Sequence, residues 1–582
     1  MRCNLENENF KENYVDNLLK IRGIQDLEGF KNPTIDNLLN PLLLKNMSAA
    51  AEVFLDKLEK EDKPIGLIVD CDTDGYTSAA IIYKYIKHLA PEKEIEYYLH
   101  EGKQHGLEDM YEKVKGKDYS LLILPDSSSN DKAYHDKLPY MCLVLDHHLS
   151  DGPFSENAII INNQLSPDYP NKEITGAGVA WQFCRYLDTL TGGDYANELI
   201  DLAALGIIGD MGGVNIVENQ YIIQTGLANV KNEMFWAILE KQSYSITRTM
   251  GVTRQEILEA LDPTAVAFYV VPLINAMIRV GTQEEKERLF LGFVDGNREI
   301  ESNKRGANHS LVGVAEESAR ECGNARNKQN RIKEAAIAKL DSKIAENNLA
   351  SNKIMFIELE EEDNFPPELT GLVAMQLVTK YSRPTLVGRV GSDGFVKGSI
   401  RGMNDSALPS LKDYLDHTSL FSFIAGHSNA AGYAINEKNI KPFIEMSNKE
   451  LADIDFGESC YSVNYSCPYV DESLANNIID VAAHKHLWGS KNPEPLFHVK
   501  NIVLDRNDIN IMGAKKNTIK FKLNGVEYIK FFAEDFIKEM MTCGDTISIE
   551  VVGRCGINSW GGLTTPQIII NGYELDDGTL AF

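Results

Sequence analysis

Between residues 46 and 225, short runs of apolar residues alternate with longer stretches in which apolar residues recur at a helical spacing. A short apolar run is typical of a buried strand, and the helical spacing indicates an amphipathic helix. The predicted strands are Ile65–Val69 and residues 94–99, 120–124, 141–145 and 158–161, and the predicted helices are residues 78–89, 177–189 and 199–208. Strands that alternate with helices predict βαβ units and a parallel sheet.

The pattern changes after residue 225. Residues 226–350 are mainly helical in pattern and end in a long polar helix over 316–347. A second α/β pattern follows, with strands at 353–359, 385–390 and 394–399 and a helix at 369–381. From about residue 495 the predicted elements are short strands, at 498–504, 518–523, 526–532, 546–552 and 567–570. Regularly spaced short strands are typical of a small β-barrel.

These patterns predict a multidomain α/β protein. The expected parts are an N-terminal extension (1–45), a catalytic domain with a parallel sheet (46–225), a helical connector (226–350), a second α/β domain (351–450) and a C-terminal OB-like β-barrel (451–582). The length of 582 residues agrees, because domains contain about 150 residues on average.

The composition adds a strongly acidic balance. The chain has 58 basic and 85 acidic residues, a formal net charge of −27, which argues against a general nucleic-acid coat protein. Net charge does not show where the charges lie. Residues 500–530 hold seven Lys and Arg against three acids, and residues 323–343 hold six against two. Either stretch could line the path of a nucleic acid, although a charge run is usually an ordinary solvated face.

The nine cysteines are dispersed and form no CxxC pair, which favours reduced thiols over a zinc site. The most apolar stretch, around residues 265–280, is interrupted by Pro272, Asn275 and Arg279, and the first 14 residues contain no apolar signal core. We therefore expect a soluble cytoplasmic protein without a membrane segment.

Acidic residues follow three of the predicted strands. They are Asp70, Asp72 and Asp74 after Ile65–Val69, Asp126 after 120–124, and Asp146 with His147 and His148 after 141–145. A further acid, Asp210, lies where a predicted helix ends among glycines. Because the carboxyl ends of parallel strands meet at one edge of a sheet, these side chains should converge.

Converging carboxylates repel one another unless a cation neutralises them. Oxygen ligands with one or two imidazoles suit Mn²⁺ or Mg²⁺, and such a set can hold two ions about 3.5–4 Å apart for attack of water on phosphorus. Taken singly, an aspartate after a strand is usually a turn or helix-capping residue. A calcium loop is disfavoured because Ile81 stands at the twelfth position. The occurrence of all four motifs in one order argues against coincidence.

These motifs, DxDxDG, PD, DHH and GD, resemble those of the DHH phosphoesterase superfamily. The resemblance implies two metal ions held by Asp72, Asp74, Asp126, His147 and Asp210, with Asp70 as a further ligand or its partner. It also implies catalytic roles for Asp126 as the bridging ligand, for Asp146, and for His148 near the scissile phosphate.

Four further segments resemble the RecJ-type single-strand exonucleases within this superfamily. Residues 272–281 (PLINAMIRVG) match with departures at Leu273 and Ile278, residues 423–432 (FIAGHSNAAG) resemble the DHHA1 substrate domain with Ala425 in place of a glycine, and residues 489–497 and 558–562 resemble the OB-type domain. The resemblance implies that a 5′-phosphate is bound by Arg279, Asn275, Ser399, Arg401, Gly426 and His427. His100 stands where the family has another arginine, for which Lys103 could substitute. The implied nucleic-acid groove of the barrel contains Lys515, Lys516, Lys520 and Trp560.

The resemblance thus predicts a single-stranded-DNA exonuclease that uses two Mn²⁺ or Mg²⁺ ions and acts 5′→3′ in DNA recombination, repair or replication. A single-strand-binding protein or a helicase is an expected partner, in a bacterial or phage-infected cell. One alternative is a DHH phosphodiesterase for short oligoribonucleotides or cyclic dinucleotides, against which the appended barrel argues. The other is a non-catalytic replication or repair scaffold, against which the intact acids argue.

Overall fold

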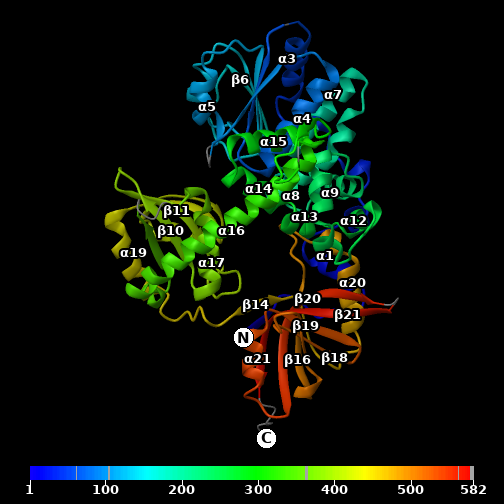
Figure 1. The fold of residues 1–582 in the computed structure, drawn as a ribbon, viewed down its shortest axis with the longest axis vertical. Helices are drawn as coiled ribbons and strands as arrows, with labels where there is room; N and C mark the ends of the chain where they lie inside the picture. The colour runs from blue at the N-terminus through cyan, green and yellow to red at the C-terminus, as the bar shows by residue number, and fades with distance from the viewer. Residues whose placement is uncertain (61, 102–104, 308, 361–364, 561–562, 577–582) are drawn as a thin grey trace. The chain divides into compact units, whose positions relative to one another are not determined.

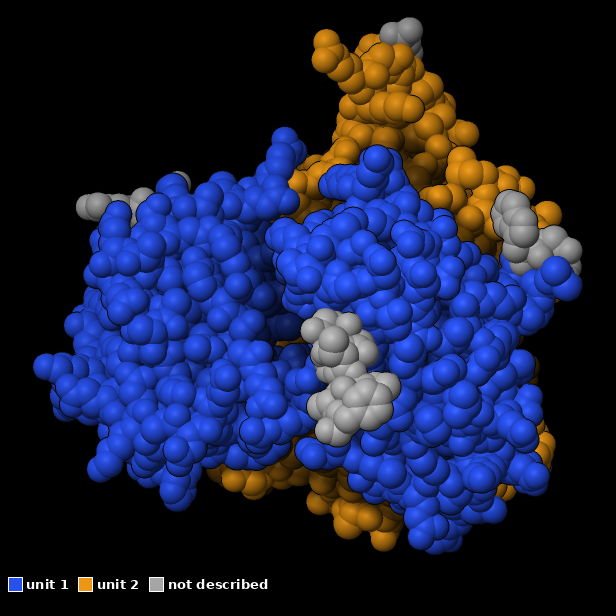
Figure 2. Space-filling model, turned by 90° about the horizontal axis from the view of Figure 1, so that it is seen from below, with its two compact units in different colours: residues 1–25, 331–485, 494–582 blue, residues 26–330, 486–493 orange. Residues whose placement is uncertain are grey.

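The structure is a computed structural model, and it describes all residues except 61, 102–104, 308, 361–364, 561–562 and 577–582 (Figure 1). The chain divides into two compact units, which Figure 2 shows in different colours. Unit 1 contains residues 1–25, 331–485 and 494–582, and unit 2 contains residues 26–330 and 486–493. Each unit is therefore assembled from segments that are far apart in the sequence.

Unit 2 is built on a parallel sheet with the strand order β3-β2-β4-β5-β6. The strands are β2 (Ile65–Val69), β3 (Ile95–Leu99), β4 (Leu121–Pro125), β5 (Cys142–Asp146) and β6 (Ala158–Asn162). The central strands β2, β4 and β5 are buried along their whole length, as is typical of a parallel sheet. The predicted parallel sheet is confirmed, because every pair of neighbouring strands in it is parallel.

Six helices of the described chain accompany this sheet, of which α4 begins at the first acidic motif and α8 ends just before Asp210. They are α3 (Met47–Lys60), α4 (Thr73–Leu89), α5 (Gly106–Val114), α6 (Lys132–His135), α7 (Gly176–Thr191) and α8 (Ile200–Gly209). Helix α4 begins five residues earlier than predicted, because the Asp72 carboxylate accepts a hydrogen bond from Gly75 N at 3.0 Å and caps the helix. The first acidic motif therefore lies at the β2–α4 junction.

The rest of unit 2 is mainly helical, as predicted. Its elements are α2 (Leu27–Lys31), α9 (Val217–Ala228), α10 (Glu233–Lys241), α11 (Ser243–Thr247), α12 (Arg254–Ala260), α13 (Pro263–Tyr269), α14 (Val271–Val280), α15 (Gln283–Val294), the hairpin β7 (Glu299–Glu301) and β8 (Leu311–Gly313), and the first half of α16 (Val314–Glu346). Within the described residues, Pro263–Val280 is the one stretch long and apolar enough to cross a membrane. It is divided between α13 and α14 and 56% of it is buried inside the protein, which makes it weak evidence for a membrane span.

The first sheet of unit 1 has the order β12-β13-β11-β10-β9. Its elements are β9 (Met355–Leu359), α17 (Thr370–Tyr381), β10 (Thr385–Val390), β11 (Phe395–Arg401), α18 (Leu411–Thr418), β12 (Phe421–His427), β13 (Ala430–Asn436) and α19 (Glu437–Glu450). Strands β9 and β10 are parallel and the others are antiparallel. Residues 423–432 lie in the β12–β13 hairpin, whose turn is at Ser428 and Asn429.

The second sheet of unit 1 is C-terminal and mixed, with the order β15-β16-β20-β21-β19-β18-β17. Its elements are β15 (Tyr465–Pro468), α20 (Leu474–Ala483), β16 (Leu496–Asp505), β17 (Asn510–Met512), β18 (Thr518–Leu523), β19 (Val526–Phe531), α21 (Glu534–Met540), β20 (Thr546–Trp560) and β21 (Leu563–Asp576). Strands β20 and β21 pair over their length; β20 is about twice as long as the apolar pattern predicted, and β21 is more than three times as long. Nearby, β1 (Arg2–Leu5) pairs with β14 (Cys460–Val463), and α1 (Tyr14–Ile21) follows. The N-terminal residues thus belong to the same unit as this sheet.

Candidate metal centre

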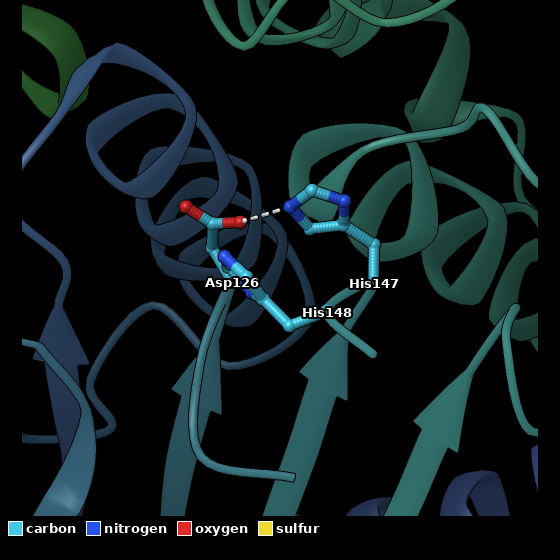
Figure 3. A group of neighbouring side chains, drawn as sticks. All are labelled: Asp126, His147 and His148. Carbon is cyan, nitrogen blue, oxygen red and sulfur yellow. Dashed lines mark ion pairs between the residues drawn. The ribbon is translucent and has the colours of Figure 1, made fainter. Parts of the chain in front are cut away.

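One histidine and three carboxylates meet at the carboxyl edge of the unit 2 sheet. His147 Nε2 lies 3.2 Å from Asp126 Oδ1, 3.5 Å from Asp210 Oδ2 and 3.9 Å from Asp74 Oδ2. Figure 3 shows the His147 ring and the Asp126 carboxylate pointing toward each other. The motifs that follow β2, β4, β5 and α8 therefore converge, as the parallel strand order requires.

The chemistry of these side chains fits a divalent cation. Asp126 Oδ1 and His147 Nε2 are both buried, and neither has a hydrogen-bond partner among the described residues. Unsatisfied buried polar atoms are costly, so a ligand that both atoms can bind would stabilise the site. The candidate ligand atoms form two groups whose members lie within 4.8 Å of one another, Asp126 with His147 and His148, and Asp74 with His147 and Asp210. Carboxylate oxygens with an imidazole suit Mn²⁺ or Mg²⁺.

The carboxylates also show the repulsion that a cation would relieve. Burial, followed by the charges of neighbouring aspartates, raises the pKa of Asp72 to about 6 and that of Asp210 to about 8. The same causes raise the pKa of Asp126 well above its ordinary value. A carboxyl group with a raised pKa is one whose ionised form is destabilised. In the absence of a cation, the cluster therefore favours protonation.

Asp74 is the best-supported carboxylate of the cluster. It is fully buried, and its oxygens accept hydrogen bonds from Thr175 Oγ1 at 2.8 Å, Gly176 N at 2.7 Å and Ala177 N at 3.0 Å. These donors lie at the first turn of α7, where free N–H groups and the helix dipole favour a negative charge. The start of α7 thus fixes one ligand of the candidate site in position.

The close approach of α7 requires a glycine at its first residue. A Cβ atom on Gly176 would lie 2.4 Å from Asp126 Oδ1, closer than real Cβ contacts allow. Asp126 itself has a left-handed backbone with φ of 64°, which is uncommon for a residue other than glycine. The position of the Asp126 carboxylate is therefore set by its backbone and by the space that Gly176 leaves.

Asp146 belongs to neither group of candidate ligands and instead holds His148. Its Oδ1 accepts hydrogen bonds from His147 N at 2.7 Å, from His148 N at 3.1 Å and from the His148 ring at 2.8 Å, while Oδ2 accepts from Ser129 N at 3.0 Å. Burial alone would raise the pKa of Asp146, but the bonds to and charges of these histidines outweigh it and lower that pKa. Burial would lower the pKa of His148, but the hydrogen bond to Asp146 and the charge of Asp146 outweigh burial and raise that pKa to about 9. His148 is therefore positively charged at neutral pH.

A further histidine of the site did not emerge from the sequence. His105 Nδ1 lies 2.5 Å from Asp70 Oδ2, and its ring centre lies 4.8 Å from that of His148. Burial lowers the pKa of His105, but its hydrogen bond to the Asp70 carboxylate and the charge of Asp70 outweigh burial and raise that pKa. His105 follows β3, which lies beside β2 in the sheet. The sequence feature that could have indicated its role is therefore a histidine that follows a predicted strand.

Comparisons with known proteins agree with this site. The model described as "DHH family, N-terminal domain" matches residues 64–207, and the model described as "RecJ OB domain" matches residues 470–572. A putative prophage-derived single-strand DNA-specific exonuclease, YorK, from Bacillus subtilis is 34% identical over 569 residues, which cover 96% of this chain and 95% of that protein. The chain belongs to the RecJ family.

More distant RecJ proteins support this membership. RecJ from Bacillus subtilis, named a single-stranded-DNA-specific exonuclease, is 25% identical over 97% of this chain and 68% of its own length. The crystal structure of Thermus thermophilus RecJ in complex with Mn²⁺ has the same fold, with a TM-score of 0.70 and 22% identity over 98% of this chain and 79% of that one. Because proteins named in this way are hydrolases, the chain is a member of a family of hydrolytic enzymes.

Two residues of the predicted phosphate group lie on α14 in unit 2. Asn275 Oδ1 accepts a hydrogen bond from Thr73 Oγ1 at 3.0 Å, which connects α14 to the start of α4. Arg279 is half-buried; burial lowers its pKa, and the charge of Asp72 opposes that effect. His100, by contrast, is fully buried with its Nε2 3.6 Å from Asp70 Oδ1. Lys103 lies outside the described residues.

The other predicted phosphate residues lie on neighbouring strands of the first sheet of unit 1. Arg401 and His427 are both paired with Ala430, and Ser399 lies two residues before Arg401, so the three residues share one face. The Ser399 hydroxyl lies 2.9 Å from Thr370 Oγ1 of α17. Gly426 has φ of 134°, a conformation that favours glycine. That these residues and Arg279 bind one phosphate stays a prediction.

The predicted groove residues of the OB-like sheet differ in environment. Lys515 and Lys516 are exposed between β17 and β18. Lys520 Nζ lies 2.8 Å from the Glu527 carboxylate, which is buried, so the charge of Lys520 is balanced within the sheet. The Trp560 side chain lies outside the described part of the structure. Phe531 and Phe532 are also exposed at the end of β19, although the sequence did not single them out.

Proposed function

We propose that the protein is a divalent-cation-dependent exonuclease that degrades single-stranded DNA from its 5′ end. The observation that carries the proposal is the convergence of Asp74, Asp126 and Asp210 on one His147 nitrogen. Membership of the RecJ family supports the reaction and the substrate, since its members are named single-strand-specific exonucleases. The direction is supported only by the sequence resemblance at Arg279, Ser399 and Arg401.

The proposed ligands are Asp72, Asp74, Asp126, His147 and Asp210, with Asp70 as a ligand or its partner. A pair of Mn²⁺ or Mg²⁺ ions, when bound there, would activate a water molecule and stabilise charge on the phosphodiester. The crystal structures of Thermus thermophilus RecJ in complex with Mn²⁺ and with Mg²⁺ support this choice of metals.

The protein's own contribution would be positioning and charge. His148 is held by the Asp146 carboxylate at 2.8 Å and is charged at neutral pH, so it can donate a hydrogen bond to a phosphate oxygen. Asp74 is fixed by the first turn of α7, with its carboxylate 3.9 Å from His147 Nε2. The hydrogen bonds that hold His148 and Asp74 are already formed in the structure, so these side chains need no rearrangement before the reaction.

The setting of this activity is also a proposal. A relative named as prophage-derived suggests DNA metabolism in a bacterial or phage-infected cell. Single-stranded DNA is the proposed partner of the OB-like sheet, whose match to the RecJ OB domain supports this. A single-strand-binding protein or helicase as a further partner stays a prediction.

The test is end-resolved digestion of oligonucleotides by the full chain. Single-stranded DNA, duplex DNA, RNA and a dinucleotide, each labelled at the 5′ or the 3′ end, are incubated with Mn²⁺, with Mg²⁺ or with EDTA. We expect early release of the 5′ label from single-stranded DNA and no reaction in EDTA. Asp126→Asn should abolish digestion, while Asp151→Asn, on an exposed loop, should not. Undiminished Mn²⁺-dependent digestion by Asp126→Asn would show that the centre is wrongly assigned, and preference for the dinucleotide would favour a small-substrate phosphodiesterase.

A further inference from the structure

Both oxygens of the Asp70 carboxylate lie next to imidazoles. Oδ2 lies 2.5 Å from His105 Nδ1, and Oδ1 lies 3.6 Å from His100 Nε2. Oδ1 has no hydrogen-bond partner among the described residues, and a shift of about 0.7 Å would bring it to ordinary hydrogen-bond distance from His100. The two groups of candidate metal ligands found around His147 in the described chain do not include Asp70. The surroundings of Asp70 are therefore those of a residue that orients histidines.

The backbone around His105 is fixed by hydrogen bonds. His105 directly precedes α5, and its N–H donates to the Asp109 carboxylate of that helix at 3.1 Å. In the first turn, Leu107 N donates to the Asp131 carboxylate at 2.7 Å. The His105 side chain is 47% exposed, although its Nδ1 contacts the buried Asp70. The His105 ring is therefore held in place by a buried carboxylate and remains accessible.

The ring of His105 contacts that of His148, the histidine proposed to face the scissile phosphate. The two ring centres lie 4.8 Å apart and the ring planes meet at 72°, an edge-to-face arrangement at a separation typical of rings in direct contact. Asp146 Oδ1 holds His148 Nδ1 at 2.8 Å. A ring that has one side-chain hydrogen bond can still turn about that bond. The contact with His105 restricts this rotation.

The centre thus contains two aspartate–histidine pairs whose rings touch. Asp146 and His148 follow β5, whereas Asp70 follows β2 and His105 follows β3, the neighbour of β2 in the sheet. In each pair a buried aspartate holds the ring of a partly exposed histidine. The two pairs differ in that only His148 belongs to a group of candidate metal ligands in the described chain.

We propose that Asp70 and His105 position His148 for the scissile phosphate and do not bind the metal ions. The inference rests on the proposed function, in which His148 contacts that phosphate. Asp70 holds the His105 ring, and that ring limits the orientations of His148, so His105 is a positioning residue that acts through its neighbour. Displacement of a catalytic group by 1 Å can slow a reaction about 100-fold, so such a support can affect the rate strongly without touching the substrate.

The first experiment measures Mn²⁺ binding to the full chain by isothermal titration calorimetry. Asp70→Asn and His105→Asn should bind as many Mn²⁺ ions as the wild type does, with nearly unchanged Kd. Asp126→Asn, at a proposed ligand, should bind fewer ions or bind them more weakly. Normal Mn²⁺ binding by the first two variants also shows that their fold is intact. Loss of an ion from Asp70→Asn would show that Asp70 is a ligand and would overturn the inference.

The second experiment measures digestion of a single strand by the same variants. Asparagine can keep the hydrogen bond to Asp70 but has no ring, so His105→Asn should lower kcat about 10- to 100-fold and leave KM nearly unchanged. Asp70→Asn should cause a smaller loss, and the double variant should lose little more than His105→Asn, because the two residues act as one unit. The control is His417→Asn, at an exposed histidine of α18, which should digest normally.

A binding measurement separates positioning from direct contact with the strand. In EDTA, fluorescence anisotropy should give the same Kd for the strand with the wild type and with His105→Asn. Weaker binding by His105→Asn would mean that His105 contacts the strand itself, and an unchanged kcat would mean that its ring has no role; either result would overturn the inference. A wild-type chain that digests no strand would overturn the proposed function, whereas the other results are obtained with an active wild type and concern the inference alone.

Discussion

Asp72 offers a direct test of the electrostatics of the metal centre, because its two roles can be separated. Its carboxylate caps α4 by accepting a hydrogen bond from Gly75 N at 3.0 Å, and it also belongs to the repelling cluster. Asparagine caps helices about as well as aspartate does. Asp72→Asn should therefore remove the charge and keep the cap.

The expected size of the effect follows from the pKa of Asp72. Folding raises it from 3.8 to about 6, which corresponds to about 3 kcal/mol of destabilisation of the ionised form. Because Asp72 holds its proton more tightly in the folded protein than in the unfolded chain, it does not lower the stability of the fold below pH 4. The loss of stability that it causes grows as the pH rises from about 4 to about 6. In EDTA at pH 8, Asp72→Asn should be up to about 3 kcal/mol more stable than the wild type, and roughly half of that difference should remain at pH 5.

Urea unfolding followed by tryptophan fluorescence can measure this difference. Three of the four tryptophans, Trp181, Trp236 and Trp488, lie in unit 2, so the signal reports mainly on the unit that contains Asp72. Mn²⁺ at 100 times its Kd should narrow this difference, since binding adds about 2.7 kcal/mol to the stability of the wild type and less to that of the variant. The control is Asp151→Asn, which removes one exposed charge. If Asp72→Asn is less stable than the wild type in EDTA at pH 8, the argument from repulsion is refuted.

Two further substitutions test the geometry of the site. In Gly176→Ala the new Cβ would collide with the Asp126 carboxylate, so Mn²⁺-dependent digestion should fall about 100-fold or more, whereas Gly116→Ala, which has open space, should digest normally. In Asp146→Asn the anion that raises the pKa of His148 to about 9 is lost, so NMR titration of the imidazole should show His148 losing its proton at a lower pH. An unchanged His148 titration would show that Asp146 does not control that charge.

The sheet of unit 2 could be predicted because burial on both faces leaves a simple pattern. Strands β2, β4 and β5 are continuous apolar runs, and each is followed at once by acidic residues. The sequence therefore indicated both the sheet and the edge at which the acids meet. It did not indicate the strand order, which places β3 beside β2. For that reason the contact of His105 with Asp70, which depends on this neighbour relation, was missed.

Features that depend on pairing across strands were less predictable. The β12–β13 hairpin consists largely of small residues, whose pattern does not distinguish a turn from a pair of strands. The neutralisation of Lys520 depends on the pairing of β18 with β19, which brings Glu527 within 2.8 Å. A count of basic residues along the sequence could not show this. Of the predicted groove lysines, Lys515 and Lys516 are the ones left exposed.

The carboxylate cluster is unequal, and this inequality explains how the fold can maintain it. Asp74 receives three hydrogen bonds from the first turn of α7, so its charge is stabilised by the protein itself. Among the described residues, Asp126 and Asp210 have no comparable set of hydrogen bonds, and burial and repulsion raise their pKa values. The Asp74 carboxylate is therefore fixed before any cation binds. A bound cation would stabilise the ionised forms of Asp126 and Asp210 the most. A site organised in this way lowers the stability of the protein without metal and makes that stability depend strongly on metal. The Asp72→Asn comparison measures this property.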